Sequence, residues 1–157
     1  MNIRFVSLSD AAQIAEIYNY YIKTSHATFE LETIDETEME NRIREVLDKD
    51  YPFFVCEENE EIIGCAFAHK FKARRAYQHS IEVSVYLKNG AEGKGIGTAL
   101  YEAIETEARR QRMNSLHAEV STTAKAFFLR MGFEVVEEQN KLVCGAAAKN
   151  FRMKKSL

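Results

Sequence analysis

The sequence predicts a mixed α/β (α+β) fold in a single domain spanning residues 1–157. Three observations support this fold class. The chain has 157 residues, which is the usual size of one domain. Apolar, β-branched runs are interleaved with stretches whose apolar residues repeat at helical spacing. No repeat, linker or low-complexity tract divides the chain, so the predicted order β-α-α-β-β-β-α-β-α-β-β describes one mixed sheet with its helices.

The chain is expected to begin with a short strand and an amphipathic helix. Residues 3–6 have the apolar character of a strand. Asp10 is a candidate N-cap, and the apolar residues after it repeat at spacings of three and four for about three turns. The stretch 24–30 has no clear period and is expected to be a loop, a kind of segment that often carries functional residues.

A second helix and a β-hairpin are expected next. Asp35 is followed three residues later by Glu38, which is the spacing of a helix-capping pair. The runs 53–56 and 62–68 are rich in β-prone residues and are separated by a polar turn at 58–60. These features predict a helix that ends before Pro52 and two antiparallel strands after it.

The second half of the chain is expected to contribute four strands and two helices. The strands are predicted at 81–87, 116–120, 133–136 and 150–154. A long helix begins at Ile96, and a short helix covers 122–130 with Gly132 as the glycine that follows its end.

Composition and charge exclude several classes of function. The net charge of −3 and pI of about 5.9 give no basic footprint for a nucleic-acid backbone, so no nucleic-acid partner is expected. The longest apolar runs are far shorter than the ~20 residues that span a bilayer, and no signal peptide is visible, so we expect a cytoplasmic protein with no membrane contact.

Cysteines and histidines do not indicate a metal site. The three cysteines form an odd set without C-x-x-C spacing, and Cys56 and Cys65 lie in apolar runs where small buried side chains are common. The four histidines are scattered along the chain. We therefore expect no bound metal.

A glycine-rich turn between the strand at 81–87 and the helix from Ile96 is typical of a phosphate-binding loop. The first turn of a helix leaves about four N–H groups without partners and carries a partial positive charge. Glycines at 93, 95 and 97 allow a ligand to approach the backbone closely, and Lys94 and Thr98 add a cation and a hydroxyl. The Walker and Rossmann patterns both fail here, because Gly95 follows the lysine and no third glycine has the required spacing.

Glu82 is an acid in the middle of an otherwise apolar strand. Removing a carboxylate from water raises its pKa, which suits a general base. The alternative is a solvent-facing glutamate at an edge of the sheet, and the glycine loop ten residues later favours the catalytic interpretation.

Residues Gly93–Thr98 resemble the pyrophosphate loop [Q/R]-x-x-G-x-[G/A] of the GNAT superfamily of acyl-CoA N-acyltransferases, with Glu92 in place of the usual Gln or Arg. The first two thirds of the chain resemble the phosphinothricin/methionine-sulfoximine N-acetyltransferase branch. The motifs that carry this resemblance are 17–22, Thr28-Phe29, 51–55, Lys72-Ala73-Arg74, Ala76-Tyr77 and 82–86. Residues 127–133 and 150–154 look more like other small bacterial members of the superfamily.

The resemblance implies a GNAT-like fold, a mixed and mostly antiparallel sheet flanked by helices, that transfers the acetyl group of acetyl-CoA to a small amino-acid-like amine. It also implies a homodimer and no metal. Glu82 matches the general base. The implied cofactor-binding residues are Val85, Tyr86, Leu87, Gly93, Lys94, Gly95, Ile96, Gly97, Thr98 and Ser121, and the implied substrate-binding residues are Phe29, Lys72, Arg74 and Tyr77.

One position departs from the family at the leaving thiolate. The Tyr or His that protonates the thiolate falls on Phe128, which cannot donate a proton, so the thiolate is expected to take its proton from water. Tyr86 is a weaker candidate acid, and the alternative is that it is a packed strand tyrosine. Two alternatives to an amino-acid acetyltransferase stay open: a module that binds acyl-CoA with little or no turnover, and an enzyme that acetylates a peptide or protein.

Overall fold

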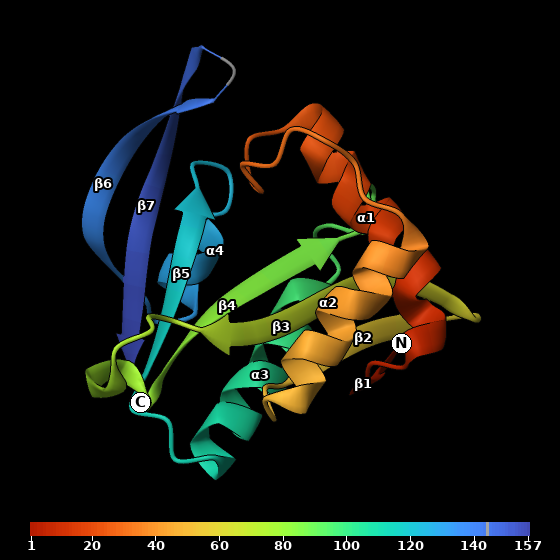
Figure 1. Ribbon diagram of the computed structural model, residues 1–157, viewed down its shortest axis with the longest axis horizontal. Helices are drawn as coiled ribbons and strands as arrows, with labels where there is room; N and C mark the ends of the chain where they lie inside the picture. Colours follow the sequence, from red (N-terminus) through yellow and green to blue (C-terminus); the bar gives the residue numbers. More distant parts are fainter. Residues whose placement is uncertain (144) are drawn as a thin grey trace.

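The computed structural model describes residues 1–143 and 145–157, so the predicted properties of Cys144 lie outside the described residues. Figure 1 shows a twisted sheet with helices packed against it. The elements are β1 Asn2–Phe5, α1 Ala11–Thr24, α2 Glu36–Asp48, β2 Phe53–Glu58, β3 Glu61–Lys70, β4 Ser80–Leu87, α3 Ile96–Arg110, β5 Ser115–Ser121, α4 Lys125–Arg130, β6 Glu134–Val143 and β7 Ala146–Ser156. This order confirms the predicted one.

The strands form one sheet in the order β1-β2-β3-β4-β5-β7-β6. Neighbouring strands are antiparallel except for β4 and β5, which are parallel. This parallel pairing is short, because only Ser80–Glu82 of β4 pairs with Ser115–His117 of β5. Figure 1 shows the two strands diverging beyond this point, which opens the sheet at its centre.

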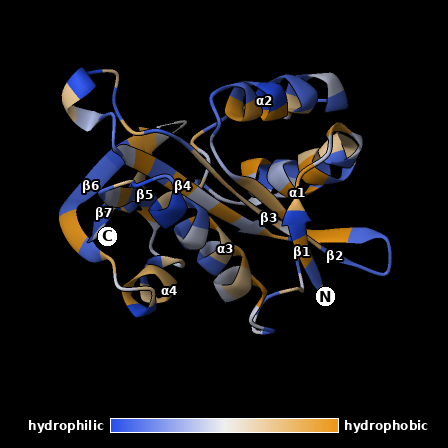
Figure 2. Cartoon of the chain, turned by 90° about the horizontal axis from the view of Figure 1, so that it is seen from below, coloured by the Kyte–Doolittle hydropathy of each residue, from blue (hydrophilic) through white to orange (hydrophobic). Residues whose placement is uncertain are grey.

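Helices cover both faces of the sheet. Figure 2 shows α1 and α2 on one side and α3 and α4 on the other. Because side chains alternate along a strand, each face has its own core. Val55 and Cys65 pack with α1 and α2, whereas Phe54, Ala66 and the side chains around them pack with α3.

The ends of two helices follow the local signals in the sequence. The carboxylate of Asp35 accepts a hydrogen bond of 2.8 Å from the Glu38 N–H, which confirms the predicted cap of α2. Gly132 has φ +92° after α4, as expected for a glycine that ends a helix. The helix predicted from residue 122 begins instead at Lys125, because the Ala124 N–H donates to the carbonyl of Ser121 and closes a turn first.

The two described cysteines are buried. Cys56 and Cys65 are 0% and 2% exposed, as expected for small apolar side chains. Burial raises the pKa of Cys65 to about 12, so its thiol stays protonated at neutral pH.

Asp10 precedes α1 as predicted, but its carboxylate does not cap the helix. It accepts two hydrogen bonds of 2.9 Å from the Arg4 guanidinium and one of 2.7 Å from the Ser7 N–H. Burial raises the pKa of Asp10, and the hydrogen bonds from Arg4 and Ser7 outweigh this effect and hold the pKa below its ordinary value of 3.8. The pair therefore ties β1 to the start of α1.

Replacing Arg4 with Met is expected to lower the free energy of unfolding by about 2–3 kcal/mol at pH 7, since it leaves a buried carboxylate without its cation. Asp10 has a depressed folded pKa, so this contribution is complete above the unfolded pKa of 3.8 and disappears as the pH falls through the folded value. Urea unfolding at pH 7 and pH 3 measures both effects. Arg44→Met, which removes an exposed pair with Glu40, is the control and should cost less than about 0.5 kcal/mol.

Candidate active site

Two cavities meet at the opening in the sheet. The smaller cavity, of about 400 Å³, lies between α1, α2 and the strands β3 and β4. The larger cavity, of about 940 Å³, is lined by the end of β4, the start of α3, the loop after β5 and α4. Four residues line both cavities: Ala27, Phe29, Tyr86 and Glu119. A ligand in the larger cavity can therefore reach a second ligand in the smaller one.

Backbone groups of β4 are directed into the opening. Lys88 donates its N–H to the Ile63 carbonyl on β3, and hydrogen-bonded pairs alternate along antiparallel strands. The backbone groups of Val85 and Leu87 therefore point away from β3, toward the gap left by β5. Tyr21 donates its hydroxyl to the Leu87 carbonyl at 2.6 Å. This leaves an extended edge that an amide-containing chain can pair with.

The glycine-rich loop has the backbone of an anion site. Gly93 and Gly95 have φ of +76° and +78°, a conformation that glycine adopts without strain, and Gly95 is the N-cap of α3. The first hydrogen bond within α3 runs from the Ala99 N–H to the Gly95 carbonyl. The amides of residues 96–98 thus precede the helical ladder and lie at the positive end of the helix dipole.

The larger cavity contains most of the predicted cofactor-binding residues. These are Val85, Tyr86, Leu87, Gly93, Gly95, Ile96, Gly97, Thr98 and Ser121. Lys94 is exposed and does not line the cavity. Gly97 packs closely, because an added Cβ would lie 3.4 Å from the Phe127 ring. The Ser121 hydroxyl accepts a 3.3 Å hydrogen bond from the Ala124 N–H, so this side chain is engaged in its own turn.

Glu92 lies at the rim of the same loop and folds back onto it. Its carboxylate accepts a hydrogen bond of 2.8 Å from the Gly90 N–H. The turn thus provides a hydrogen-bond donor for the carboxylate that replaces the usual Gln or Arg. Its negative charge nevertheless lines the cavity beside the helix start.

Replacing Glu92 with Gln is expected to lower the KM for acetyl-CoA about two- to tenfold, since it removes a charge that would repel a diphosphate at the predicted site and keeps an oxygen for the Gly90 N–H. The effect should shrink at high salt, where exposed charges are screened. Initial rates at 0.05 and 0.5 M NaCl measure it, and an unchanged KM at low salt would contradict it.

Glu82 lies on the central strand β4 with its side chain in the smaller cavity, and not at a sheet edge. In the sheet register it is opposite His69 of β3 and beside His117 of β5. Burial is the main effect on its carboxyl, and the charge of Glu119 adds to it. Together they raise the pKa of Glu82 to about 7, while Lys141 and Arg152 oppose the shift. The carboxyl is therefore poised to exchange a proton near neutral pH.

Glu119 is a residue that the sequence interpretation missed. Asn150 donates a hydrogen bond of 2.8 Å to its carboxylate, and Arg152 and Lys141 lie 3.5 and 3.8 Å from it. It places a second acid where the two cavities join. Residues alternate along 116–120, so Glu119 is predicted on the opposite face of the strand from the apolar residues. No local signal in the sequence places it near Glu82.

The predicted substrate-binding residues fall into two groups. Phe29 lines both cavities, has φ +56°, and lies under the Lys141 ammonium, 4.8 Å from its ring centre. Lys72, Arg74 and Tyr77 lie in the segment before β4 and line neither cavity of the described chain. Lys72 instead lies over the Tyr77 ring at 5.0 Å. Only Phe29 of the four is thus brought to Glu82's cavity.

Tyr86 and Phe128 show what surrounds the predicted thiolate position. Tyr86 packs against the rings of Tyr18 and Tyr21, with centroids 5.3 Å apart in each case, and burial raises its pKa. Phe128 is a buried residue 5.1 Å from the Phe133 ring, and it lines the larger cavity. Phe128 has no proton to donate, whereas the Tyr86 hydroxyl stays protonated at neutral pH.

The comparison with known proteins identifies the family. Residues 3–146 match the family described as acetyltransferase (GNAT) domain. The chain belongs to the GNAT acetyltransferases. Solved structures share the fold of this chain. One is a phosphinothricin acetyltransferase from Sinorhizobium meliloti in complex with acetyl-CoA (TM-score 0.94, 28% identity, covering 99% of this chain and 88% of that one). Another is yncA, a putative acetyltransferase from Salmonella typhimurium with acetyl-CoA (TM-score 0.93, 26% identity, covering 100% of this chain and 94% of that one).

The curated relatives include enzymes of the branch that the sequence resembles. It is 37% identical over 98 residues to phosphinothricin N-acetyltransferase of Alcaligenes faecalis (62% of this chain, 50% of the relative). It is 34% identical over 115 residues to the L-methionine sulfoximine/L-methionine sulfone acetyltransferase of Salmonella typhimurium (70% and 64%). These matches span about half to two thirds of the length of each relative.

Within residues 1–143 and 145–157, no group of three His, Cys, Asp or Glu side chains is arranged to hold a metal ion. None of the described helices has the length and apolar character to cross a membrane.

Proposed function

We propose that this GNAT domain, residues 1–157, transfers the acetyl group of acetyl-CoA to the amine of a small amino-acid-like acceptor. The observation that carries the proposal is the position of Glu82. It lies in the smaller cavity, close to the place where that cavity joins the one formed by the glycine loop and the open edge of β4. The first cavity suits the acceptor and the second suits the cosubstrate.

The larger cavity fits the parts of coenzyme A. Amides at the start of α3 are suited to hold a diphosphate, and the edge of Val85–Leu87 is suited to pair with the amides of a pantetheine arm. Its volume of about 940 Å³ leaves room for such an extended ligand. Acetyl-CoA supplies the activated acetyl group, and the Val85 N–H, which points into the gap, can donate a hydrogen bond to the thioester oxygen.

Glu82 would make the acceptor reactive. An ammonium group has no lone pair for attack, so a base must take a proton first, directly or through water. With its pKa raised to about 7, Glu82 can remove that proton and release it to solvent afterwards. In the transfer the new C–N bond forms, the C–S bond breaks, and the leaving sulfur takes a proton. Tyr86 or water provides that proton, because Phe128 has none to donate.

The names of the relatives support the acceptor class. Phosphinothricin and methionine sulfoximine are small amino acids with a second polar group, and the cavity of about 400 Å³ suits an acceptor of this size better than a protein chain. Lys72, Arg74 and Tyr77 stay predicted substrate-binding residues. The homodimer also stays a prediction, and light scattering tests it.

Calorimetry and a thiol-release assay test the proposed function. Acetyl-CoA should bind, and coenzyme A should be released in the presence of at least one member of a panel of amino acids, simple amines and peptides. Binding without release would instead support a GNAT module that only holds acyl-CoA, a second candidate that the loss of the usual proton donor at Phe128 favours. Release with the peptide alone would favour a protein acetyltransferase.

A further inference from the structure

His69 stands out among the residues of the smaller cavity. Its Nδ1 is a buried side-chain polar atom with no hydrogen-bond partner in the described chain. The ring lines the same cavity as Glu82, and the two residues are directly opposite each other on β3 and β4. Because Nδ1 is closed off from the cavity, the other ring nitrogen, Nε2, is the one that a ligand in the cavity can contact.

The burial of Nδ1 determines which hydrogen-bonding group the ring offers. An N–H buried without an acceptor is more costly than a buried lone pair, so the proton of the neutral ring belongs on Nε2. Burial also lowers the pKa of His69, with Glu45 opposing and Lys49 adding to the shift, which keeps the ring neutral at pH 7. His69 therefore offers the cavity one hydrogen-bond donor, the Nε2–H.

The pairing of His69 with Glu82 matches the shape of an α-amino acid. Directly opposite residues on antiparallel strands have Cβ atoms about 4.5–5.5 Å apart. The ammonium and carboxylate groups of an α-amino acid share one carbon, so their partners must lie side by side in this way. Glu82 suits the ammonium group, and the His69 donor suits a carboxylate oxygen.

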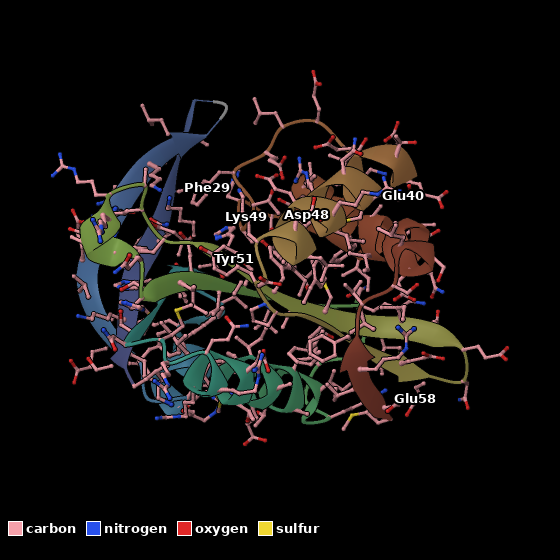
Figure 3. The ribbon with its side chains drawn as sticks, turned by 60° about the horizontal axis from the view of Figure 1, so that its bottom comes forward. Phe29, Glu40, Asp48, Lys49, Tyr51 and Glu58 are labelled. Carbon is pink, nitrogen blue, oxygen red and sulfur yellow. The ribbon has the colours of Figure 1, made fainter. Side chains whose placement is uncertain are left out.

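A cation from α2 lies on the same side of the cavity. Lys49 follows the last residue of α2 and lines the cavity, and its ammonium is 3.1 Å from the Glu45 carboxylate. Figure 3 shows Lys49 beside the end of α2, and Phe29 and Tyr51 line the same cavity. The floor of the cavity is apolar, formed by Met39, Val46, Phe53, Cys65 and Phe67. This floor suits an uncharged side chain.

We propose that His69, assisted by Lys49, binds the carboxylate of an α-amino acid acceptor that has an uncharged side chain, while its ammonium group faces Glu82. This inference rests on the proposed acetyl transfer and names the acceptor class for it. His69 is then the residue that selects α-amino acids over amines without a carboxylate.

A matched pair of acceptors tests the proposal. L-methionine and 3-(methylthio)propylamine differ only by the carboxylate. With saturating acetyl-CoA, His69→Leu should lower kcat/KM for L-methionine about 10- to 100-fold and change it less than twofold for the amine. His69→Gln, which keeps a donor, should recover most of the loss. His79→Leu, a change at an exposed histidine outside both cavities, should change neither value.

The outcomes separate this inference from the proposed function. An equal loss with both acceptors would show that His69 only supports the fold, and it would overturn the inference while acetyl transfer stands. Equal kcat/KM values for L-methionine and the amine in the unsubstituted protein would also overturn it. No transfer to either acceptor or to the wider amine panel would overturn the proposed function itself, and the inference with it.

Discussion

Replacing Glu82 with Gln is expected to lower kcat/KM for acetyl transfer by about 10²–10⁴ while the Kd for acetyl-CoA stays nearly unchanged. The amide keeps the size of the side chain but cannot take the proton of the acceptor ammonium. Because Glu82 lines the smaller cavity and not the larger one, we expect the binding of the cosubstrate not to depend on it. Steady-state rates with calorimetry of acetyl-CoA binding measure both quantities.

The pH dependence gives a second, independent test of Glu82. Its pKa is raised to about 7, so kcat/KM should rise as the pH increases through 7 and the carboxylate forms, and Glu82→Gln should lose this limb. Glu119→Gln should move the limb to lower pH, since the charge of Glu119 helps to raise the pKa of Glu82. Unchanged turnover in Glu82→Gln, or a limb that persists in it, would exclude Glu82 as the base.

Local signals were enough to predict most of the fold. Asp35 and Glu38 define the start of α2 through a hydrogen bond from the Glu38 N–H to the Asp35 carboxylate, and Gly132 ends α4 through its own φ angle. Such interactions join neighbours in the chain, so they are visible in the sequence. The start of α4 was misplaced because the Ser121 turn competes with the helix for the same residues.

The residues of the candidate site were likewise predictable only where they are neighbours in the sequence. The glycine loop is one continuous segment, and its residues were predicted together with Glu82 on the preceding strand. The other polar residues that line the cavity of Glu82 come from elsewhere in the chain, among them His69 from β3, Glu119 from β5 and Lys49 from the end of α2. Strand register and the divergence of β4 from β5 bring them together, and neither is encoded in a local pattern. Lys72, Arg74 and Tyr77 were implied by the family resemblance; they line neither cavity of the described chain and stay predictions.

Replacing Gly95 with Ala is expected to raise the KM for acetyl-CoA about 10- to 100-fold with little change in kcat. Gly95 caps α3 with φ +78° and lines the larger cavity, with no atom within 4 Å of an added Cβ. The new methyl group would therefore project into space that the diphosphate needs, and it would also strain the loop that orients the amides of residues 96–98. Steady-state kinetics with acetyl-CoA as the varied substrate measure this effect.

Gly90 provides the control, because it separates backbone strain from contact with the ligand. It also has positive φ, +87°, and open space around an added Cβ, but it does not line the larger cavity. Gly90→Ala and Gly95→Ala should therefore lose similar stability in urea unfolding, about 1 kcal/mol each. Only Gly95→Ala should lose affinity for acetyl-CoA. Equal losses of affinity would mean that the loop acts through its fold alone, and that the start of α3 is not where the diphosphate binds.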